Sequence, residues 1–236
     1  MKAFLLAAGK GTRLRPLTDS TPKCLLPIRG TPVLAIWMEL CRRFGIDEVL
    51  INVHAHSDSI RRYLASAHNG VQVHIAEEPV LLGSAGTLAA NRSWVASEPA
   101  FWVFYGDVLS NVDLGRMLDY HRRRNPVATL GVYEVPDPSR CGILSLDRED
   151  VVRDFVEKPA APAGNLAFAG ILLASPALLH AIPDRVPVDI GFDVLPRLAG
   201  RSVAYRITEY LVDIGTMENY CAAQRDWPGL ASPRLP

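Results

Sequence analysis

Four cations and two glycines gather near the N-terminus, between Ala7 and Lys23. They follow residues 2–6, a short apolar run that predicts a buried first strand. Small residues with free N–H groups at the end of a strand suit the phosphates and base of a nucleotide, because the backbone can approach the ligand closely. Several fixed cations fit a triphosphate better than a single carboxylate. The cations are Lys10, Arg13, Arg15 and Lys23.

The spacing of the glycines excludes two common phosphate-binding loops. A dinucleotide fingerprint that starts at Gly9 requires a glycine where Leu14 stands. A P-loop requires a Gly-Lys pair followed by Ser or Thr, whereas Gly9-Lys10 is followed by Gly11. The alternative is an ordinary tight turn with solvated charges, but nearby prolines would stiffen the loop more than a connector needs. These prolines are Pro16, Pro22 and Pro27.

Two aspartates are candidates to bind Mg²⁺. Asp107 follows a glycine after the apolar run 101–105, and a carboxylate at the carboxyl end of a strand is a usual Mg²⁺ ligand. Asp213 is the second candidate and stands just before the last predicted helix. Asp107 could instead be a turn or helix-cap residue, and Asp213, followed closely by Gly-Thr, also suits a plain turn.

A further polar group lies in Glu157-Lys158-Pro159, at the end of a later predicted strand. A carboxylate beside an ammonium group suits a ligand that has hydroxyls at one end and a dianion at the other. The alternative is a pair of adjacent surface charges. His54 and His56 could also ligate a metal, but no third ligand is placed nearby, and we leave them out of the site.

Strands that alternate with helices in the first part of the chain predict an α/β fold with a mainly parallel, Rossmann-like sheet and helices on both faces. Strands are expected at 2–6, 48–53, 71–76 and 101–105, with helices at 31–44, 57–67 and 113–124, the first capped by Thr31. The second part predicts a smaller, β-rich lobe with strands at 128–135, 142–146, 152–156 and 166–173. Helices are then expected at 176–182, 192–198 and 217–225.

Composition excludes several classes of protein. The 236 residues carry 25 basic and 25 acidic side chains, so no global field favours nucleic acid or an acidic membrane. The longest later apolar stretch, 166–174, is far shorter than a membrane span. Four scattered cysteines without CxxC spacing argue against a zinc site or a disulfide framework, and predict a cytoplasmic protein.

The stretch 9–18, Gly-Lys-Gly-Thr-Arg-Leu-Arg-Pro-Leu-Thr, together with Pro22-Lys23, resembles the signature of sugar-1-phosphate nucleotidyltransferases, also called NDP-sugar pyrophosphorylases. The resemblance covers residues 2 to about 224 and looks closest to mannose- and heptose-1-phosphate guanylyltransferases. It implies a nucleotide-diphospho-sugar transferase fold in a single domain over 1–227. Residues 1–125 would bind the nucleotide, residues 126–227 would bind the acceptor, and residues 228–236 would form a frayed tail.

The resemblance also implies roles for individual residues. Asp107 and Asp213 would together hold Mg²⁺, while Arg13 and Mg²⁺ would stabilise the departing pyrophosphate. Lys23 and Lys158 would hold the two reacting phosphates, so these five residues are the expected catalytic set. The expected nucleotide-binding residues are Ala7, Ala8, Gly9, Gly11, Thr12, Arg13, Glu78, Gly83, Ser84 and Asp107. The expected substrate-binding residues are Gly142, whose N–H would meet the sugar, Glu157, which would accept hydrogen bonds from sugar hydroxyls, Lys158, Phe168 and Leu211.

Two positions depart from the family pattern. Phe168 stands where the family usually has an asparagine that touches sugar hydroxyls, and Leu211 stands where an aromatic residue is frequent. Both changes make the acceptor pocket more apolar, which favours an acceptor with fewer hydroxyls, such as a deoxysugar or an unsaturated cyclitol. The alternative is ordinary drift with repacking.

The predicted activity is Mg²⁺-dependent transfer of a nucleoside monophosphate from an NTP to a sugar-1-phosphate or a cyclitol phosphate. GTP is favoured, because Glu78 would lie near the base edge and a carboxylate can accept both N1–H and N2–H₂ of guanine. Open alternatives are a member that uses dTTP, UTP, CTP or ATP, and a homologue that binds nucleotide-sugars without turnover. A glycosyltransferase of related fold is disfavoured, because Gly106-Asp107-Val108-Leu109 has one aspartate and no Asp-x-Asp. Assembly into a homo-oligomer stays open.

Overall fold

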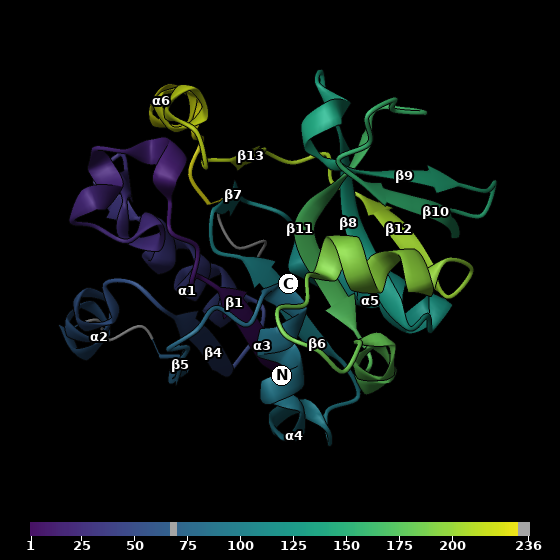
Figure 1. Cartoon of the computed structure of the whole chain (residues 1–236), viewed down its shortest axis with the longest axis horizontal. Coiled ribbons are helices and arrows are strands. Elements are labelled where there is room, and N and C mark those ends of the chain that lie inside the picture. The colour runs from purple at the N-terminus through teal and green to yellow at the C-terminus, as the bar shows by residue number, and fades with distance from the viewer. Residues whose placement is uncertain (67–69, 231–236) are drawn as a thin grey trace. The chain divides into compact units, whose positions relative to one another are not determined.

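The computed structural model describes residues 1–66 and 70–230, and their contacts divide into two compact units. The first unit comprises residues 1–80, residues 104–113 and the chain from residue 209 onward. The second comprises residues 81–103 and 114–208. Figure 1 labels the elements of both units. The expected division into ligand-binding parts at residue 125 concerns ligands and stays a prediction.

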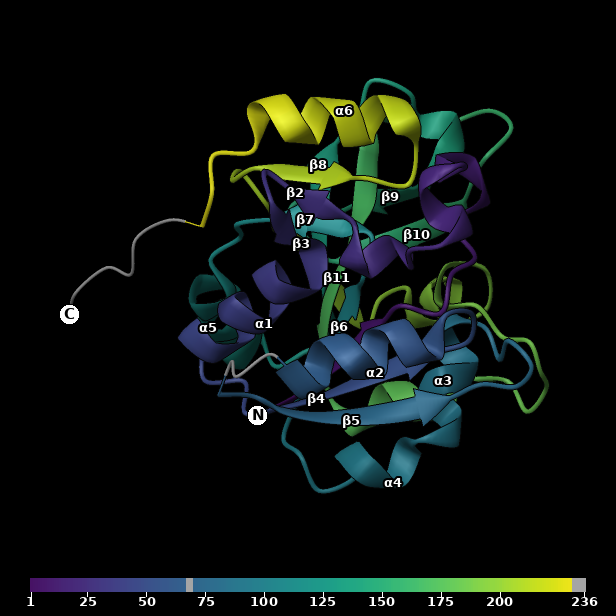
Figure 2. The same cartoon turned by 90° about the vertical axis from the view of Figure 1, so that its left-hand side faces the viewer.

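A parallel ladder of three strands forms the centre of the first unit. β1 (Lys2–Leu6) pairs with β4 (Glu48–Val53), which pairs with β5 (Gln72–Glu77). Leu6 lies opposite Asn52, and Val53 lies opposite Glu77, so the carboxyl ends of the three strands share one edge. Helix α2 (Ser57–Ser66) lies along one face of β4 and β5 (Figure 2). Residue 67, the expected end of this helix, is outside the described residues.

Helix α1 (Val33–Arg43) packs in the first unit through the apolar side that its sequence predicts. Trp37 is 2% exposed, stacks on Phe104 with ring centroids 4.5 Å apart, and donates from Nε1 to the carbonyl of Val108 at 2.8 Å. The prediction that Thr31 caps this helix is wrong, because the backbone of Thr31 belongs to the hairpin of β2 (Pro27–Ile28) and β3 (Thr31–Pro32). Pro32 stands at the N-cap.

Two short strands that the sequence pattern did not predict, β7 (Val108–Ser110) and β13 (Leu211–Asp213), complete the first unit. β6 (Phe101–Tyr105) carries the chain from the second unit into the first, and β7 follows directly. β7 pairs antiparallel with β13. Helix α6 (Met217–Asp226) follows, and the Thr216 hydroxyl accepts a hydrogen bond from the amide of Asn219 at its first turn.

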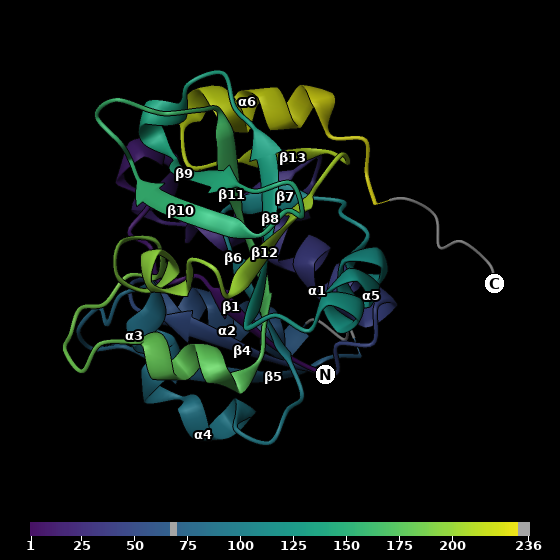
Figure 3. The ribbon, with the colours of Figure 1, turned by 90° about the vertical axis from the view of Figure 1, so that its right-hand side faces the viewer.

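The second unit is rich in antiparallel strands (Figure 3). β8 (Ala128–Glu134) and β9 (Gly142–Leu146) both pair with β11 (Leu166–Ala174), and β9 also pairs with β10 (Val152–Glu157). β12 (Ser202–Arg206), which was not predicted, runs parallel to β8. The predicted α/β class, with parallel strands and helices followed by a β-rich part, is confirmed.

Helices of the second unit include α3 (Ser84–Ala90), α4 (Arg92–Val95) and α5 (Leu114–Arg124). Short 3-10 helices lie at Pro138–Arg140 and Pro176–Ala181. The helix expected at 192–198 is instead a π-helix at Ile190–Val194 followed by a 3-10 helix at Leu195–Leu198. Pro196 lacks the N–H that a regular helix would need there. Among the described residues, no helix combines the length and the apolar character needed to cross a membrane.

Candidate active site

A buried chain of polar groups joins the ends of β1, β4 and β5. The amide of Ala7 donates to Asn52 Oδ1 at 2.7 Å, and Asn52 Nδ2 donates to Glu78 Oε1 at 2.9 Å. Both side chains are 4% exposed, and His54 Nδ1 lies 2.7 Å from the Glu78 carbonyl oxygen. The position of Ala7 is therefore fixed by hydrogen bonds inside the unit. Asn52 was missed, although one amide residue in the apolar run 49–53 is a signal that could have found it.

The loop after β1 is fixed from within and leaves its cations on the surface. The Thr18 hydroxyl donates to the carbonyl of Gly11 at 2.7 Å, and a methyl group on Gly11 would come 2.9 Å from Thr18 Cγ2. Gly11 also has a φ of 63°, in the left-handed region that favours glycine. Leu14 is fully buried and anchors the loop, whereas Thr12 and Arg13 are exposed. This arrangement leaves backbone and guanidinium donors of the loop accessible to a ligand.

Lys23 and Asp107 form an ion pair in the first unit, with Lys23 Nζ 2.7 Å from Asp107 Oδ2. The pair borders a small pocket at the end of β1. Gly106 is needed beside it, because a methyl group there would come 2.9 Å from the carbonyl oxygen of Leu6. The pocket is lined by Leu6, Ala7, Gly9, Lys23, Cys24, Gly106 and Asp107. A cation and a carboxylate thus stand at the position that the sequence predicts for triphosphate and metal.

Asp213 reaches the same place through the pairing of β7 with β13. Asp213 lies opposite Val108 in the ladder, and the amide of Ile214 donates to the carbonyl of Asp107 at 2.9 Å. Burial raises the pKa of Asp213, and the charge of Asp107 raises it further, while the Gly215 amide, Lys23 and Arg13 lower it. The two carboxylates therefore interact electrostatically, as a shared cation site requires.

Arg13 joins this cluster at Gly215. A methyl group on Gly215 would come 2.7 Å from Asp213 Oδ1 and 3.0 Å from Arg13 Nη2. The carboxylate of Asp213 and the guanidinium of Arg13 therefore both lie close to the backbone of Gly215. The first unit thus brings together four of the five expected catalytic residues, Arg13, Lys23, Asp107 and Asp213. A pair of carboxylates fits Mg²⁺, which takes one or two carboxylates together with phosphate oxygens. Residues 1–66 and 70–230 hold no group of three or more His, Cys, Asp or Glu side chains suited to a metal.

Glu157 lies in the second unit, and its carboxylate occupies space that is free because residue 142 is a glycine without a side chain. A methyl group on Gly142 would overlap the ring of Phe155 and come 2.6 Å from Glu157 Oε2. Burial raises the pKa of Glu157, an effect that Lys158 opposes and Asp189 reinforces. Lys158 Nζ lies 3.6 Å from Glu157 Oε1 and is largely exposed. A half-buried carboxylate beside an accessible ammonium group is the pairing that the sequence predicts for the acceptor.

Phe168 and Leu211 fall in different units. Phe168 belongs to β11 of the second unit, and its ring lies edge-on to that of Phe155 at 6.3 Å between centroids. Leu211 opens β13 in the first unit, opposite Ser110. Phe168 therefore places a second aromatic ring beside Phe155, the ring that a methyl group on Gly142 would overlap. Leu211 lies two residues before Asp213.

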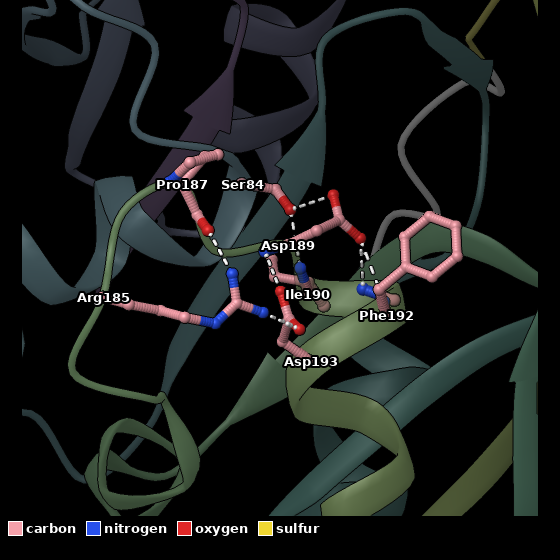
Figure 4. A network of polar contacts seen from close by, with 8 residues as sticks. Ser84, Arg185, Pro187, Asp189, Ile190, Phe192 and Asp193 are labelled. Carbon is pink, nitrogen blue, oxygen red and sulfur yellow. Dashed lines mark hydrogen bonds and ion pairs between the residues drawn. The ribbon is translucent and has the colours of Figure 1, made fainter.

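The Gly83-Ser84 turn is held by a loop of the second unit rather than open on all sides. A methyl group on Gly83 would overlap the carbonyl oxygen of Val188. The Ser84 hydroxyl donates to Asp189 Oδ2 at 2.8 Å and accepts from the amide of Ile190 at 2.7 Å (Figure 4). The roles expected for Gly83 and Ser84 in nucleotide binding stay predictions. Sequence reasoning missed Asp189, since the contact that ties it to this turn, with Ser84, joins residues 105 apart in the chain.

Gly83→Ala should destabilise the fold. The change forces an alanine to adopt a φ of 81° and pushes its methyl group into backbone that cannot move aside, which together should cost about 2–4 kcal/mol of unfolding free energy. Gly200→Ala is the matched control, because its φ is 73° but no atom lies within 4 Å of the added methyl group. Urea denaturation of both variants measures the difference. Equal losses would show that the contact with Val188 contributes nothing.

The chain is similar to known proteins in sequence and in fold. The family model for nucleotidyl transferases matches residues 2–228. Mannose-1-phosphate guanylyltransferase 1 of Arabidopsis thaliana is 33% identical over 95% of the chain, and UTP–glucose-1-phosphate uridylyltransferase of Synechocystis is 32% identical over 95%. The chain spans 64% and 63% of these two relatives. The crystal structure of HddC from Yersinia pseudotuberculosis, 24% identical, superposes with a TM-score of 0.82 over 96% of the chain and 99% of its own length. The chain belongs to the nucleotidyl transferase family.

Proposed function

We propose that the protein transfers a nucleoside monophosphate from an NTP to a sugar-1-phosphate or a sugar-like cyclitol phosphate, giving an NDP-sugar and pyrophosphate. The observation that carries the proposal is the cluster at the end of β1. There the Lys23–Asp107 ion pair, Asp213 and Arg13 combine two cations with two carboxylates. Membership of the family and two relatives named for transfer to a sugar-1-phosphate support it.

The reaction needs no side-chain nucleophile. The acceptor phosphate is a dianion at neutral pH, because its second pKa is about 6. One of its oxygens attacks the α-phosphorus of the NTP, a new P–O bond forms, and the bond to the bridging oxygen of pyrophosphate breaks. Lys23 and Lys158 are each proposed to hold one of the two reacting phosphates, and Arg13 is proposed to donate to the pyrophosphate as negative charge builds on it.

Asp107 and Asp213 are proposed as the Mg²⁺ ligands. When bound, Mg²⁺ would supply charge neutralisation for the phosphate oxygens. The residues fit this ion because the pair has oxygen donors only, and because the charge of Asp107 raises the pKa of Asp213. A cation bound by both carboxylates would reduce the electrostatic repulsion between Asp107 and Asp213. In the structure Lys23 partly does so, through its contact with Asp107.

The test of the reaction class is release of pyrophosphate. Each of GTP, ATP, UTP, CTP and dTTP would be incubated with Mg²⁺ and, in turn, mannose 1-phosphate, glucose 1-phosphate, deoxysugar 1-phosphates and cyclitol phosphates. We expect release that requires both an NTP and an acceptor. Binding of nucleotide-sugar with no release in any combination would favour the non-catalytic alternative.

GTP is the proposed nucleotide, and Glu78 is proposed to read the base. Glu78 does not point to solvent, because its side chain is 4% exposed and Asn52 Nδ2 donates to one of its carboxylate oxygens. The Arabidopsis relative is named for guanylyl transfer, whereas the Synechocystis relative is named for uridylyl transfer. The relatives alone therefore leave the base open.

Glu78→Gln should reduce the preference for GTP over UTP more than it reduces activity with the best NTP. A carboxylate that accepts from guanine is worth about 1–3 kcal/mol of discrimination by analogy with base readout, which is roughly 5- to 150-fold in kcat/KM. Glu77→Gln is the matched control, because Glu77 is exposed and pairs with Arg61 on the surface. A Glu78→Gln variant that keeps its full preference, or a wild type that uses every NTP equally, would contradict the role of Glu78.

Two further assignments belong to the proposal. Phe168 and Leu211, each an apolar replacement, support an acceptor with fewer hydroxyls, because a sugar hydroxyl left without a partner beside either side chain would cost about 1–3 kcal/mol. The four cysteine thiols, Cys24, Cys41, Cys141 and Cys221, are all free, which supports the proposed cytoplasmic location.

A further inference from the structure

Residues 189–194 of the second unit, which comprise Asp189 and the single-turn π-helix Ile190–Val194, are held in place by hydrogen bonds to Asp189. We call this segment the 189–194 turn. Asp189 Oδ1 accepts from the amides of Gly191 at 2.8 Å and Phe192 at 3.1 Å (Figure 4). Its other oxygen accepts from the Ser84 hydroxyl, which in turn accepts from the amide of Ile190. Asp189 thereby fixes three successive residues of the 189–194 turn to one another and to the start of α3.

The same turn is also held from its far side. Asp193 Oδ2 accepts from the amide of Asp189 at 2.8 Å, and Asp193 Oδ1 pairs with the guanidinium of Arg185. Arg185 also donates to the carbonyl of Pro187 at 2.8 Å (Figure 4). The side chains of Asp189 and Asp193 thus hold the backbone of the 189–194 turn at its two ends.

The path of the turn brings Gly191 against Glu157. A methyl group on Gly191 would come 2.5 Å from Glu157 Oε2, so the backbone of the turn lies directly on the carboxylate. With Gly142 on another side, Glu157 is enclosed by two glycines that leave its oxygens room. The 189–194 turn is thus part of the surroundings of the proposed acceptor-binding carboxylate.

Phe192 is the one large side chain that this turn presents to solvent. It is 57% exposed, and its ring extends away from the hydrogen-bonded groups in Figure 4. The ring centroid lies 5.7 Å from Lys158 Nζ, and Lys158 in turn contacts Glu157. An exposed aromatic face beside a cation and a carboxylate matches a ligand that combines a carbon–hydrogen face with hydroxyls and a phosphate.

We propose that the 189–194 turn forms a wall of the acceptor subsite, where Phe192 packs its ring against the carbon–hydrogen face of a cyclic acceptor. Asp189 is a positioning residue that acts by holding Gly191 and Phe192 beside Glu157. The inference rests on the proposed function, in which Glu157 and Lys158 bind the acceptor. It adds a class preference: a pyranose or cyclitol phosphate is favoured over an open-chain phosphate such as glycerol 3-phosphate.

The test is steady-state kinetics with whichever acceptor the wild type uses fastest among mannose 1-phosphate, glucose 1-phosphate, deoxysugar 1-phosphates and cyclitol phosphates. Phe192→Ala should raise the acceptor KM by about tenfold, while kcat and the NTP KM change by less than about twofold, because an aromatic contact contributes mainly to binding. Phe192→Tyr, which keeps the ring, should restore the acceptor KM. Val186→Ala removes an exposed side chain from the preceding segment and should change neither value.

Asp189 is tested by a pair of variants. Asp189→Ala removes both acceptors and should raise the acceptor KM at least as much as Phe192→Ala. Asp189→Asn keeps an oxygen for the amides of Gly191 and Phe192, so it should restore most of the acceptor affinity. A role in stability alone would lower the midpoint of thermal unfolding without separating the two KM values.

The outcomes separate this inference from the reaction class. If the wild type turns over but Phe192→Ala keeps the wild-type acceptor KM, or raises the NTP KM equally, the inference is overturned while the proposed function stands. If the wild type releases no pyrophosphate from any NTP with any acceptor of the panel, both are overturned. An acceptor KM that rises alone, and falls again in Phe192→Tyr, supports the inference.

Discussion

Asp107→Asn and Asp213→Asn are each expected to lower turnover at least 100-fold, roughly, because each removes a charged ligand from the proposed Mg²⁺ site. Neither variant should unfold. Burial and the neighbouring charge of Asp107 already raise the pKa of Asp213, so a neutral amide is tolerated there. The measurement is initial rate against Mg²⁺ concentration, with the midpoint of thermal unfolding recorded for each variant.

Asp58→Asn is the control for loss of an acidic side chain, since Asp58 is exposed in the first turn of α2. It should keep the wild-type rate at every Mg²⁺ concentration. If Asp107→Asn or Asp213→Asn also keeps a near-normal rate when Mg²⁺ is limiting, that aspartate is not a metal ligand.

Arg13→Ala should lower kcat by about 10²–10³ with a smaller change in the NTP KM, because negative charge on pyrophosphate grows as the bond breaks. Arg13 is exposed on the loop after β1, and its Nη2 shares the point at Gly215 with Asp213. The charge on its guanidinium is therefore held close to the proposed metal site rather than spread into solvent.

Arg42→Ala is the control for loss of an exposed arginine, because Arg42 lies in the last turn of α1 and forms a surface ion pair with Glu39. An exposed pair of this kind is worth little, so kcat should stay within about twofold of the wild type. A loss in Arg13→Ala that is confined to the NTP KM would reduce Arg13 to a binding residue.

Much of the fold followed from local sequence patterns. Apolar runs marked β1, β4 and β6, and the alternation with helices predicted the parallel strands of the first unit. The strands β7 and β13 were missed because each has three residues, too few to show a period, and because their pairing joins residues about a hundred apart. Their pairing is nevertheless what places Asp213 beside Asp107.

The candidate site was predictable where one short stretch carried the chemistry. Lys23 and Arg13 stand within one loop, and the motif located both. Asn52 and Asp189 were not found, since the hydrogen bonds that join Asn52 to Ala7 and Asp189 to Ser84 link residues 45 and 105 apart in the chain. The π-helix at Ile190–Val194 also escaped prediction, because it depends on the Asp189 cap and not on a helical period.

The most direct test of the account is the fate of the α- and γ-phosphates of the NTP. GTP labelled at the α-phosphate, or at the γ-phosphate, would be incubated with Mg²⁺, the protein and its best sugar-1-phosphate, and the products would be separated. We expect the α-label in an NDP-sugar and the γ-label in pyrophosphate, in equal amounts. Label in inorganic phosphate, or a γ-label transferred to the acceptor, would contradict nucleotidyl transfer.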